Sequence, residues 1–301
     1  MREPKIASRL SVSVARVNEL VVGWVAEEDI QLGRPQPVTF FVIGLLDLMT
    51  SWLNQKRHFD IEDASASLLN LVQHGLSSGP WVPLAIRSGN PQIGVPQIFD
   101  REARNRMKRE AFLRAGTRFF NNLGFGGVAL AEVAGSLGVT RGAFYYHFPD
   151  KEQLLDQCLE ASLTVVEDAL DQAEAHSDAG LEIIEHALRD LTYQQASGVT
   201  PLLRPSLSSA LPAARQRRHA ARLRNIARRF GDALESGMSH GEARQVDVAI
   251  VEQILTNAIF INGGYTIAAA NSFTDWRISE DPLTATIDYT HLLMMGLESR
   301  P

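Results

Sequence analysis

Prolines and glycines concentrate in one short stretch of the chain, residues 77–97, which contains four prolines and three glycines. Proline lacks an amide hydrogen and clashes with the preceding helical turn, so no continuous helix runs through this stretch. On both sides of it, apolar residues recur every three or four positions, and no alternating segments bounded by hairpin turns are found. The sequence therefore predicts an all-α fold interrupted by a Pro/Gly-rich linker at residues 80–100.

The composition is that of a protein with a sizeable core, since 45% of the 301 residues are hydrophobic and 21% are charged. The single cysteine, Cys158, excludes an intrachain disulfide and a multi-cysteine metal site, which suits a reducing cytoplasm. The most apolar run, residues 38–53, contains Asp47 and is shorter than the roughly 20 residues of a membrane span. No signal peptide is recognisable. We expect a cytoplasmic protein that does not bind membranes.

Positive charge is concentrated in residues 101–151, although the whole chain carries a formal charge of −6. Nine basic and four acidic side chains give this segment a charge of +5, which leaves −11 on the other residues. Attraction to phosphate acts locally, because salt screens it over about 8–10 Å. The segment is therefore a candidate for nucleic-acid binding; the alternative is a solvated helix face.

Two short helices are predicted inside the basic segment, at residues 130–137 and 140–147, with Gly138 in the turn between them. Ala134 is small enough for the two helices to cross closely, and Phe144 can seal a small core beneath them. A pair of short helices joined by a glycine-containing turn has the dimensions of a helix-turn-helix.

The flanking helices carry clear start and stop signals. Apolar residues from Phe112 to Leu123 predict a helix that ends at Gly124. Asp150 is placed to cap a long helix that begins directly after Pro149. The helix-turn-helix is thus predicted to lie between two longer helices.

The second short helix has a face suited to a duplex. Its outward positions are predicted to be Thr140, Arg141, Tyr145 and Tyr146. Arginine reads guanine edges with two hydrogen bonds, and hydroxyl groups suit phosphate oxygens. Thr140 is also placed to cap this helix.

The run GFGGVALAEVAGSLGVTRGAFYYHFPDKEQLL, residues 124–155, resembles the DNA-binding domain of the tetracycline-repressor (TetR/AcrR) family. The matching positions are Gly124, Phe125, Val133, Ala134, Leu137, Gly138, Val139, Gly142, Phe144, Tyr145, His147, Phe148, Lys151 and Leu154. The resemblance implies a DNA-binding domain over residues 101–163. It also implies DNA contacts from Thr140, Arg141, Gly142, Tyr145, Tyr146 and His147, and a phosphate contact from Lys151 at the start of the next helix.

One position departs from the family pattern. The family usually has Thr or Ser at the start of the helix before the turn, where this chain has Val128 and Ala129. A helix cap and a phosphate-binding hydroxyl are both missing, which costs about 1 kcal/mol of helix stability. We expect weaker or altered DNA binding.

The resemblance implies that residues 164–301 form an effector-binding and dimerisation domain, with the last two helices pairing with another subunit. Helices are predicted at 181–195, 212–238, 246–270 and 282–297. Residues 215–229 are rich in arginine, and we interpret them as a solvated helix face rather than a second nucleic-acid site. The sequence identifies neither the effector nor its binding residues, and it indicates no cofactor and no metal.

A weak internal repeat links the two ends of the chain. Residues 26–53 resemble residues 234–261, and LLNLVQHGL (68–76) resembles YTHLLMMGL (289–297). Residues 1–79 are therefore interpreted as a truncated second copy of a regulatory domain. Its predicted helices, 38–53 and 61–76, would then pack on 246–270 and 282–297 as an internal four-helix bundle.

These features favour a ligand-responsive DNA-binding transcriptional regulator, a repressor that a small molecule releases from a palindromic double-stranded operator. It would act as a homodimer or an internal pseudo-dimer. The alternative is a protein-interaction module with weakened DNA binding that pairs with a related regulator. We do not expect an enzyme, because the sequence lacks a phosphate-binding glycine loop and a His-Glu-x-x-His motif.

Overall fold

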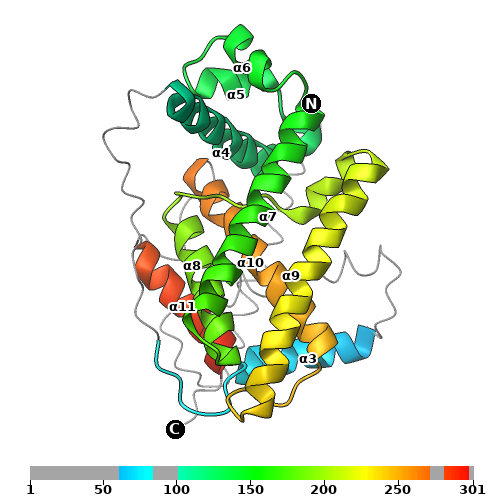
Figure 1. The fold of residues 1–301 in the computed structure, drawn as a ribbon, viewed down its shortest axis with the longest axis vertical. Coiled ribbons are helices and arrows are strands. Elements are labelled where there is room, and N and C mark those ends of the chain that lie inside the picture. Colours follow the sequence, from blue (N-terminus) through cyan, green and yellow to red (C-terminus); the bar gives the residue numbers. More distant parts are fainter. Residues whose placement is uncertain (1–60, 84–100, 272–280, 298–301) are drawn as a thin grey trace.

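The computed structural model describes residues 61–83, 101–271 and 281–297, and within these ranges it is built from helices without a β-strand (Figure 1). In chain order they are α3 (Ile61–His74), α4 (Arg101–Gly127), α5 (Leu130–Ser136), α6 (Arg141–His147), α7 (Lys151–His176), α8 (Gly180–Ala196), the 3-10 helix η2 (Pro205–Ala210), α9 (Ala213–Ser239), α10 (Val248–Asn271) and α11 (Pro282–Met295). The predicted all-α class is confirmed. Among the described helices, none combines the length and apolarity needed to cross a membrane.

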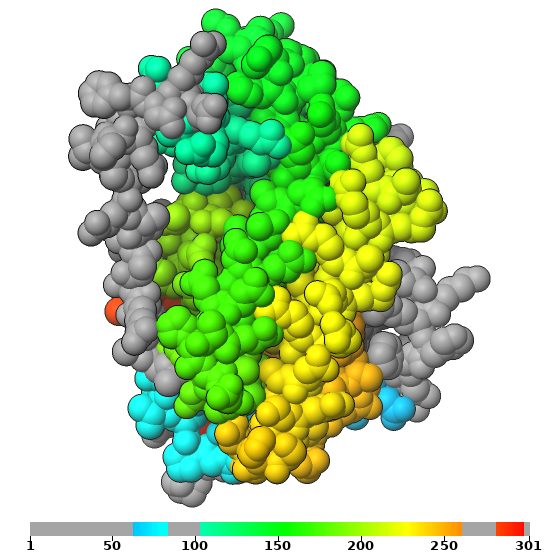
Figure 2. Space-filling model, viewed as in Figure 1, coloured from blue at the N-terminus to red at the C-terminus, as the bar shows by residue number. Residues whose placement is uncertain are grey.

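The described helices form a small head at one end of the molecule and a larger body (Figure 1). We call α4, α5, α6 and residues 151–158 of α7 the head, and the rest of α7 with α8–α11 the body. Helix α7 runs from the head along the body, and α9 lies beside it, as the molecular surface in Figure 2 also shows. The predicted domain boundary at residues 163–164 therefore falls inside one continuous helix.

Three phenylalanine rings pack together in the core of the head. The ring of Phe112 on α4 lies 5.0 Å from that of Phe144 and 6.2 Å from that of Phe148, measured between centroids. Leu154 and Leu155 of α7 are fully buried in the same cluster. Burying side chains of this size contributes roughly 1.5–3 kcal/mol each, so the first turns of α7 are an essential part of the head.

The predicted turns and caps around the short helices are confirmed. Helix α4 is broken at Gly124, where φ is 67°, and the α5–α6 turn has Gly138 at φ 65°. The hydroxyl of Thr140 accepts a hydrogen bond from the amide three residues later, at 3.2 Å. The carboxylate of Asp150 does the same at the start of α7, at 2.7 Å. Both left-handed positions are glycines because a Cβ is strained there.

The body has its own apolar core, to which α7, α8, α9, α10 and α11 all contribute. The four helices predicted across this half are present, and their ends differ from the prediction by at most two residues. The 3-10 helix η2 was not predicted, because six residues between prolines show no helical period.

Helix α3 packs against α10 and α11 at the end of the body remote from the head (Figure 1). It forms within the predicted range 61–76, whereas the helix predicted at 38–53 lies outside the described residues. Beyond α3, the indole of Trp81 donates a hydrogen bond to the Glu185 carboxylate at 2.6 Å. The start of the predicted linker is therefore held against α8.

Cys158 is a core residue of the head. It is fully buried, and its thiol lies 3.4 Å from the carbonyl oxygen of Leu113, to which it donates a hydrogen bond. Burial raises the pKa of the Cys158 thiol from 9.0 to about 12. The thiol therefore stays protonated in the folded chain at pH values where an exposed thiol ionises.

We predict that iodoacetamide alkylates Cys158 much more slowly in the native chain than in urea at pH 9, as measured by mass spectrometry. Between pH 9 and about 12 the unfolded chain releases the proton of the Cys158 thiol, whereas the folded chain retains it. The free energy of unfolding therefore falls as pH rises through this window. Equal alkylation rates with and without urea would contradict the burial of this side chain.

Candidate nucleic-acid interface

The α5–turn–α6 unit has the geometry of a helix-turn-helix. The amide of Val139 donates to the carbonyl of Ala134 at 3.1 Å, which closes the turn around Gly138. Phe144 on α6 and Val133 on α5 are fully buried between the helices. The inner face of α6 is therefore fixed by packing, and its other face points away from the head.

The side chains predicted to contact DNA from α6 lie on this outward face. Arg141 and Tyr145 are exposed, and Tyr146 is the most exposed aromatic residue in the described ranges, at 86%. At Gly142 nothing lies within 4 Å of the position where a Cβ would stand, so the backbone is open to a close approach there. Thr140 is exposed as well, but its hydroxyl oxygen already caps the helix.

The two remaining predicted residues, His147 and Lys151, are less open. The His147 ring is half-buried, 5.3 Å from the ring of Phe112 and 5.2 Å from that of Tyr146. The Lys151 ammonium lies 4.5 Å from the centre of the Phe125 ring, a cation–π distance. Lys151 is also the first residue of α7, so a phosphate bound there would face the positive end of the helix.

Further basic residues of the head lie along α4. Arg104, Arg106 and Lys108 are exposed, while Arg109 donates a hydrogen bond to Gln157 at 2.6 Å. The excess positive charge of this segment is therefore presented to solvent by α4 and α6.

The cap expected to be missing from the helix before the turn is indeed missing. Ala129 occupies the N-cap position of α5 and has no side-chain hydrogen bond, unlike Thr140 and Asp150 at the next two helices. An alanine cap leaves the first amides of α5 to solvent. Of these three successive helix starts in the head, α5 is the one without a side-chain cap.

Residues 112–158 match the family model described as bacterial regulatory proteins, tetR family. This part of the chain is therefore similar to the tetR-family regulators. The match runs from Phe112 in α4 to Cys158 in α7, and it therefore covers the helix-turn-helix and the aromatic core beneath it.

Curated relatives are similar over the same part of the chain. The tetracycline repressor protein class C of Escherichia coli is 39% identical over 61 residues, which are 20% of this chain and 28% of the repressor. The HTH-type transcriptional regulator AcrR of Shigella flexneri is 41% identical over 54 residues, 18% of this chain and 25% of AcrR. The aligned part thus spans only about a quarter of the length of these relatives.

The solved structures that this chain matches include the TetR family transcriptional regulator PfmR from Thermus thermophilus. It is 17% identical, and the match covers 62% of this chain and 99% of PfmR with a TM-score of 0.48. Another is the ketosteroid transcriptional regulator KstR2 of Mycobacterium tuberculosis, which is 18% identical with a TM-score of 0.46 and coverages of 62% and 91%.

The head is joined to the body by polar contacts that the sequence did not reveal. The side chain of Asn121, buried at the end of α4, donates to the carbonyl of Leu202 at 2.9 Å and accepts from the amide of Arg204 at 3.1 Å. Arg118 donates to the carbonyl of Gly198 at 2.7 Å. The segment before η2 is thereby bound to α4, and its Leu203 is buried in the core of the head.

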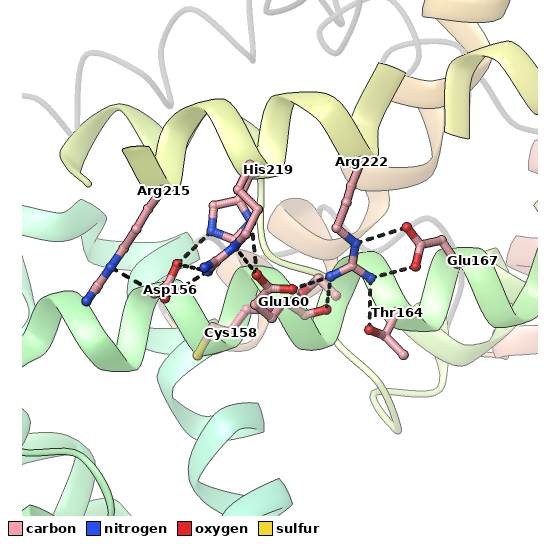
Figure 3. Close-up of polar contacts among 10 residues, drawn as sticks. Asp156, Cys158, Glu160, Thr164, Glu167, Arg215, His219 and Arg222 are labelled. Atoms are coloured by element: carbon pink, nitrogen blue, oxygen red, sulfur yellow. Dashed lines mark hydrogen bonds and ion pairs between the residues drawn. The ribbon is translucent and has the colours of Figure 1, made fainter. Parts of the chain in front are cut away.

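A second set of polar contacts joins α7 to α9 (Figure 3). Arg222 forms two hydrogen bonds with the Glu167 carboxylate, at 3.0 and 2.6 Å, and also pairs with Glu160. The hydrogen bonds with Glu167 raise the pKa of the Arg222 guanidinium above its usual value. Further along, Arg229 pairs with Asp171 and Glu174.

Near the start of α7, Asp156 contacts several residues of α9 (Figure 3). Its carboxylate lies 2.7 Å from Nε2 of the buried His219 and 3.0 Å from Arg218, with Arg215 at 3.7 Å. Asp156, Glu160 and His219 lie close enough to hold a metal ion. Arginines already supply the positive charge at both carboxylates. The arrangement is therefore a row of ion pairs between α7 and α9, which we call the α7–α9 seam.

The interpretation of residues 215–229 as a solvated helix face holds for Arg217, Arg224 and Arg228, which are exposed, and needs correction for the side that faces α7. Four arginines of this stretch, Arg215, Arg218, Arg222 and Arg229, form ion pairs with α7. These arginines face the carboxylates of α7, because charge-assisted hydrogen bonds to carboxylates stabilise a guanidinium group and an apolar neighbour does not.

Substituting Ala129 by serine should supply the missing cap and stabilise the chain by roughly 0.5–1 kcal/mol. The reverse control, Thr140→Ala, should destabilise it by a similar amount, because it removes a cap that is present. Urea denaturation of both variants measures these changes. A serine that leaves stability unaltered, beside a clear loss in Thr140→Ala, would contradict the assignment of Ala129 as the cap.

The Arg222→Ala variant should lose roughly 1–3 kcal/mol of stability, between the values typical of exposed and buried pairs, because Glu167 loses its ion-pair partner and Glu160 keeps only Arg218 of its arginine partners. The matched control is Arg224→Ala on the exposed side of α9, which should change stability by less than about 0.5 kcal/mol. Urea denaturation at low and high salt measures both. Equal effects of the two substitutions would show that the seam does not contribute.

Proposed function

We propose that this chain is a DNA-binding transcriptional regulator, a repressor whose release from DNA is controlled by a small-molecule effector. The observation that carries the proposal is the exposed face of α6, where Arg141, Tyr145 and Tyr146 project from a helix held by buried packing. Support also comes from the match of residues 112–158 to the tetR family. The two curated relatives described above are named as a tetracycline repressor and a transcriptional regulator.

In this proposal α6 enters the major groove of double-stranded DNA. Arg141 reads a guanine edge, and the phenols of Tyr145 and Tyr146 donate to phosphate oxygens. The open backbone at Gly142 admits the sugar-phosphate chain, and Thr140 keeps the first turn of α6 formed. His147 supports Tyr146 through its ring contact, and Lys151 binds a phosphate from the start of α7.

The proposed division of labour is the one expected from the sequence: residues 101–163 bind DNA, residues 164–301 bind the effector and a partner subunit, and residues 80–100 are a linker. An effector would act by favouring one of two head positions. The contacts that must carry this change are Asn121 with the segment before η2, and the α7–α9 seam. Two heads read a palindromic operator only when their spacing matches successive major grooves, about 34 Å apart.

We predict that Arg141→Ala reduces discrimination against altered operators by about 1–3 kcal/mol, because a base contact is lost. Lys151→Ala should instead weaken binding to all sequences alike and reduce the slope of affinity against salt by about one phosphate contact. Fluorescence anisotropy with DNA from the promoter region of the chain's own gene, over a salt series, measures both effects.

The control for this experiment is Arg217→Ala, which removes an exposed arginine of α9 far along the chain from α6. It should leave both affinity and salt dependence unchanged. If all three variants lose the same affinity, the protein binds DNA through its overall charge and the proposed readout by α6 is wrong.

The second candidate is a protein-interaction module with weakened DNA binding that pairs with a related regulator. Two observations favour it: α5 begins at the uncapped Ala129, and the Lys151 ammonium rests on the Phe125 ring. This candidate predicts that the purified chain binds DNA with no steep salt dependence, so the same titration separates the two functions.

The proposal also keeps residues 1–79 as a truncated second copy of the regulatory domain. Helix α3 is the described part of that copy, and it supports the idea by packing on α10 and α11, the pair of helices that the repeat assigns to the complete copy. The chain would then pair as a homodimer or as an internal pseudo-dimer.

A further inference from the structure

Helices α3 and α11 are equivalent in length and in the residues directly after their last turns. Each contains 14 residues, and a shift of 221 positions maps Ile61–His74 onto Pro282–Met295. Each is succeeded by a glycine with positive φ, 64° at Gly75 and 71° at Gly296, and then by a buried leucine. The sequence repeat at the ends of these helices is thus also a repeat of backbone conformation.

The buried side chains of the two helices are equivalent under the same shift. Four pairs are buried at corresponding positions: Ala64 and Ala285, Leu71 and Leu292, Val72 and Leu293, Leu76 and Leu297. Apart from the alanines, these residues all belong to the core of the body. Both helices therefore direct the same face into one core.

The hydrogen bonds between the two helix ends are reciprocal. The amide of Leu76 donates to the carbonyl of Leu293 at 3.0 Å, and the amide of Leu297 donates to the carbonyl of Val72 at 2.8 Å. Under the shift of 221 positions, Leu76 corresponds to Leu297 and Val72 corresponds to Leu293. The second bond is therefore equivalent to the first, with the donor helix and the acceptor helix exchanged. Two helices related in this way are related by a local two-fold axis.

The glycines mark where this axis passes. A Cβ added at Gly75 would meet the backbone of Met294 closer than 3.0 Å, and one added at Gly296 would meet the backbone of Gln73 closer than 3.0 Å. Gln73 and Met294 are again equivalent under the shift. The two chain segments therefore cross in direct backbone contact, which only glycine permits on both sides.

In a two-fold homodimer, residue i of one subunit contacts j of the other while j contacts i. The α3–α11 contact has this property within one chain. We propose that α3 occupies the site at which the α11 helix of a second copy of this chain would bind, and that it blocks that dimer contact in the intact chain. The inference rests on the proposed truncated copy and is independent of DNA binding.

One side-chain contact outside the two-fold relation, that of Arg244 with Asn70, favours α3 over a second α11. Arg244, in the connection between α9 and α10, donates to the carbonyl of Gly75 at 2.9 Å and to the side-chain oxygen of Asn70 at 2.9 Å. Its amide donates to the carbonyl of Leu76 at 2.8 Å. At the position equivalent to Asn70, α11 carries His291, which lacks that amide oxygen.

The test is the mass of the full chain in solution, by light scattering during gel filtration and without DNA. The intact chain should elute as one chain of 33.2 kDa. Gly75→Ala should double the mass, because α3 no longer fits while Gly296 still lets two α11 helices cross. Gly296→Ala should stay at one chain, because it obstructs both arrangements.

Gly241→Ala is the matched control. Gly241 has φ 75°, but nothing lies within 4 Å of its added Cβ, so this variant carries the backbone strain without an obstruction. It should elute like the intact chain. A doubled mass for Gly241→Ala, or for Gly75→Ala and Gly296→Ala alike, would overturn the proposal by showing a dimer contact elsewhere.

A milder pair of variants covers the case in which Gly75→Ala does not fold. Leu76→Ala and Leu297→Ala each shorten one of two equivalent buried side chains and leave the backbone unstrained. Leu76→Ala should increase the dimer fraction severalfold, and Leu297→Ala should not. Equal dimer fractions in the two variants would refute the assignment of α3 as the occupant, whatever the outcome of the DNA titration.

Discussion

Helix α7 contributes buried side chains to both hydrophobic cores, and it thereby joins the head to the body. Leu154 and Leu155 near its start are buried among the aromatic rings of the head, while Val166 and Leu170 two or more turns later are buried in the body. A helix is stiff over this length, so a shift of the body along α7 moves the helix-turn-helix with it. The segment before η2 forms another link: Asn121 bonds to its backbone, Leu202 is buried in the core of the body and Leu203 in the core of the head.

The seam between α7 and α9 has a regular origin. Arg215, Arg222 and Arg229 are spaced by seven residues, and so are Glu160, Glu167 and Glu174 on α7. A seven-residue spacing keeps side chains on one face over several turns, so two helices running in the same direction meet along matched rows of charge. Since these groups are only partly exposed, salt screens them less than it screens ion pairs on an open surface.

The sequence predicted the head in detail because its signals are local. Gly138, Thr140 and Asp150 each fix a turn or a cap through bonds within a few residues, and these positions are as expected. Four arginines of α9 were misinterpreted, because their partners lie 55 to 62 positions earlier in the chain. The seven-residue spacing was the signal available for that pairing. No sequence pattern indicated the contact of Asn121 with the segment before η2, since a single asparagine near a helix end is equally compatible with an exposed position.

The covalent link between α3 and the rest of the chain has a quantitative consequence for assembly. A segment tethered to its own binding site acts at an effective concentration on the order of millimolar. A free second copy, present at far lower concentration, must therefore bind α11 much more tightly than α3 does in order to displace α3. If α3 holds this place, one chain presents one helix-turn-helix and selects half of a palindromic operator, unless another surface brings two heads together.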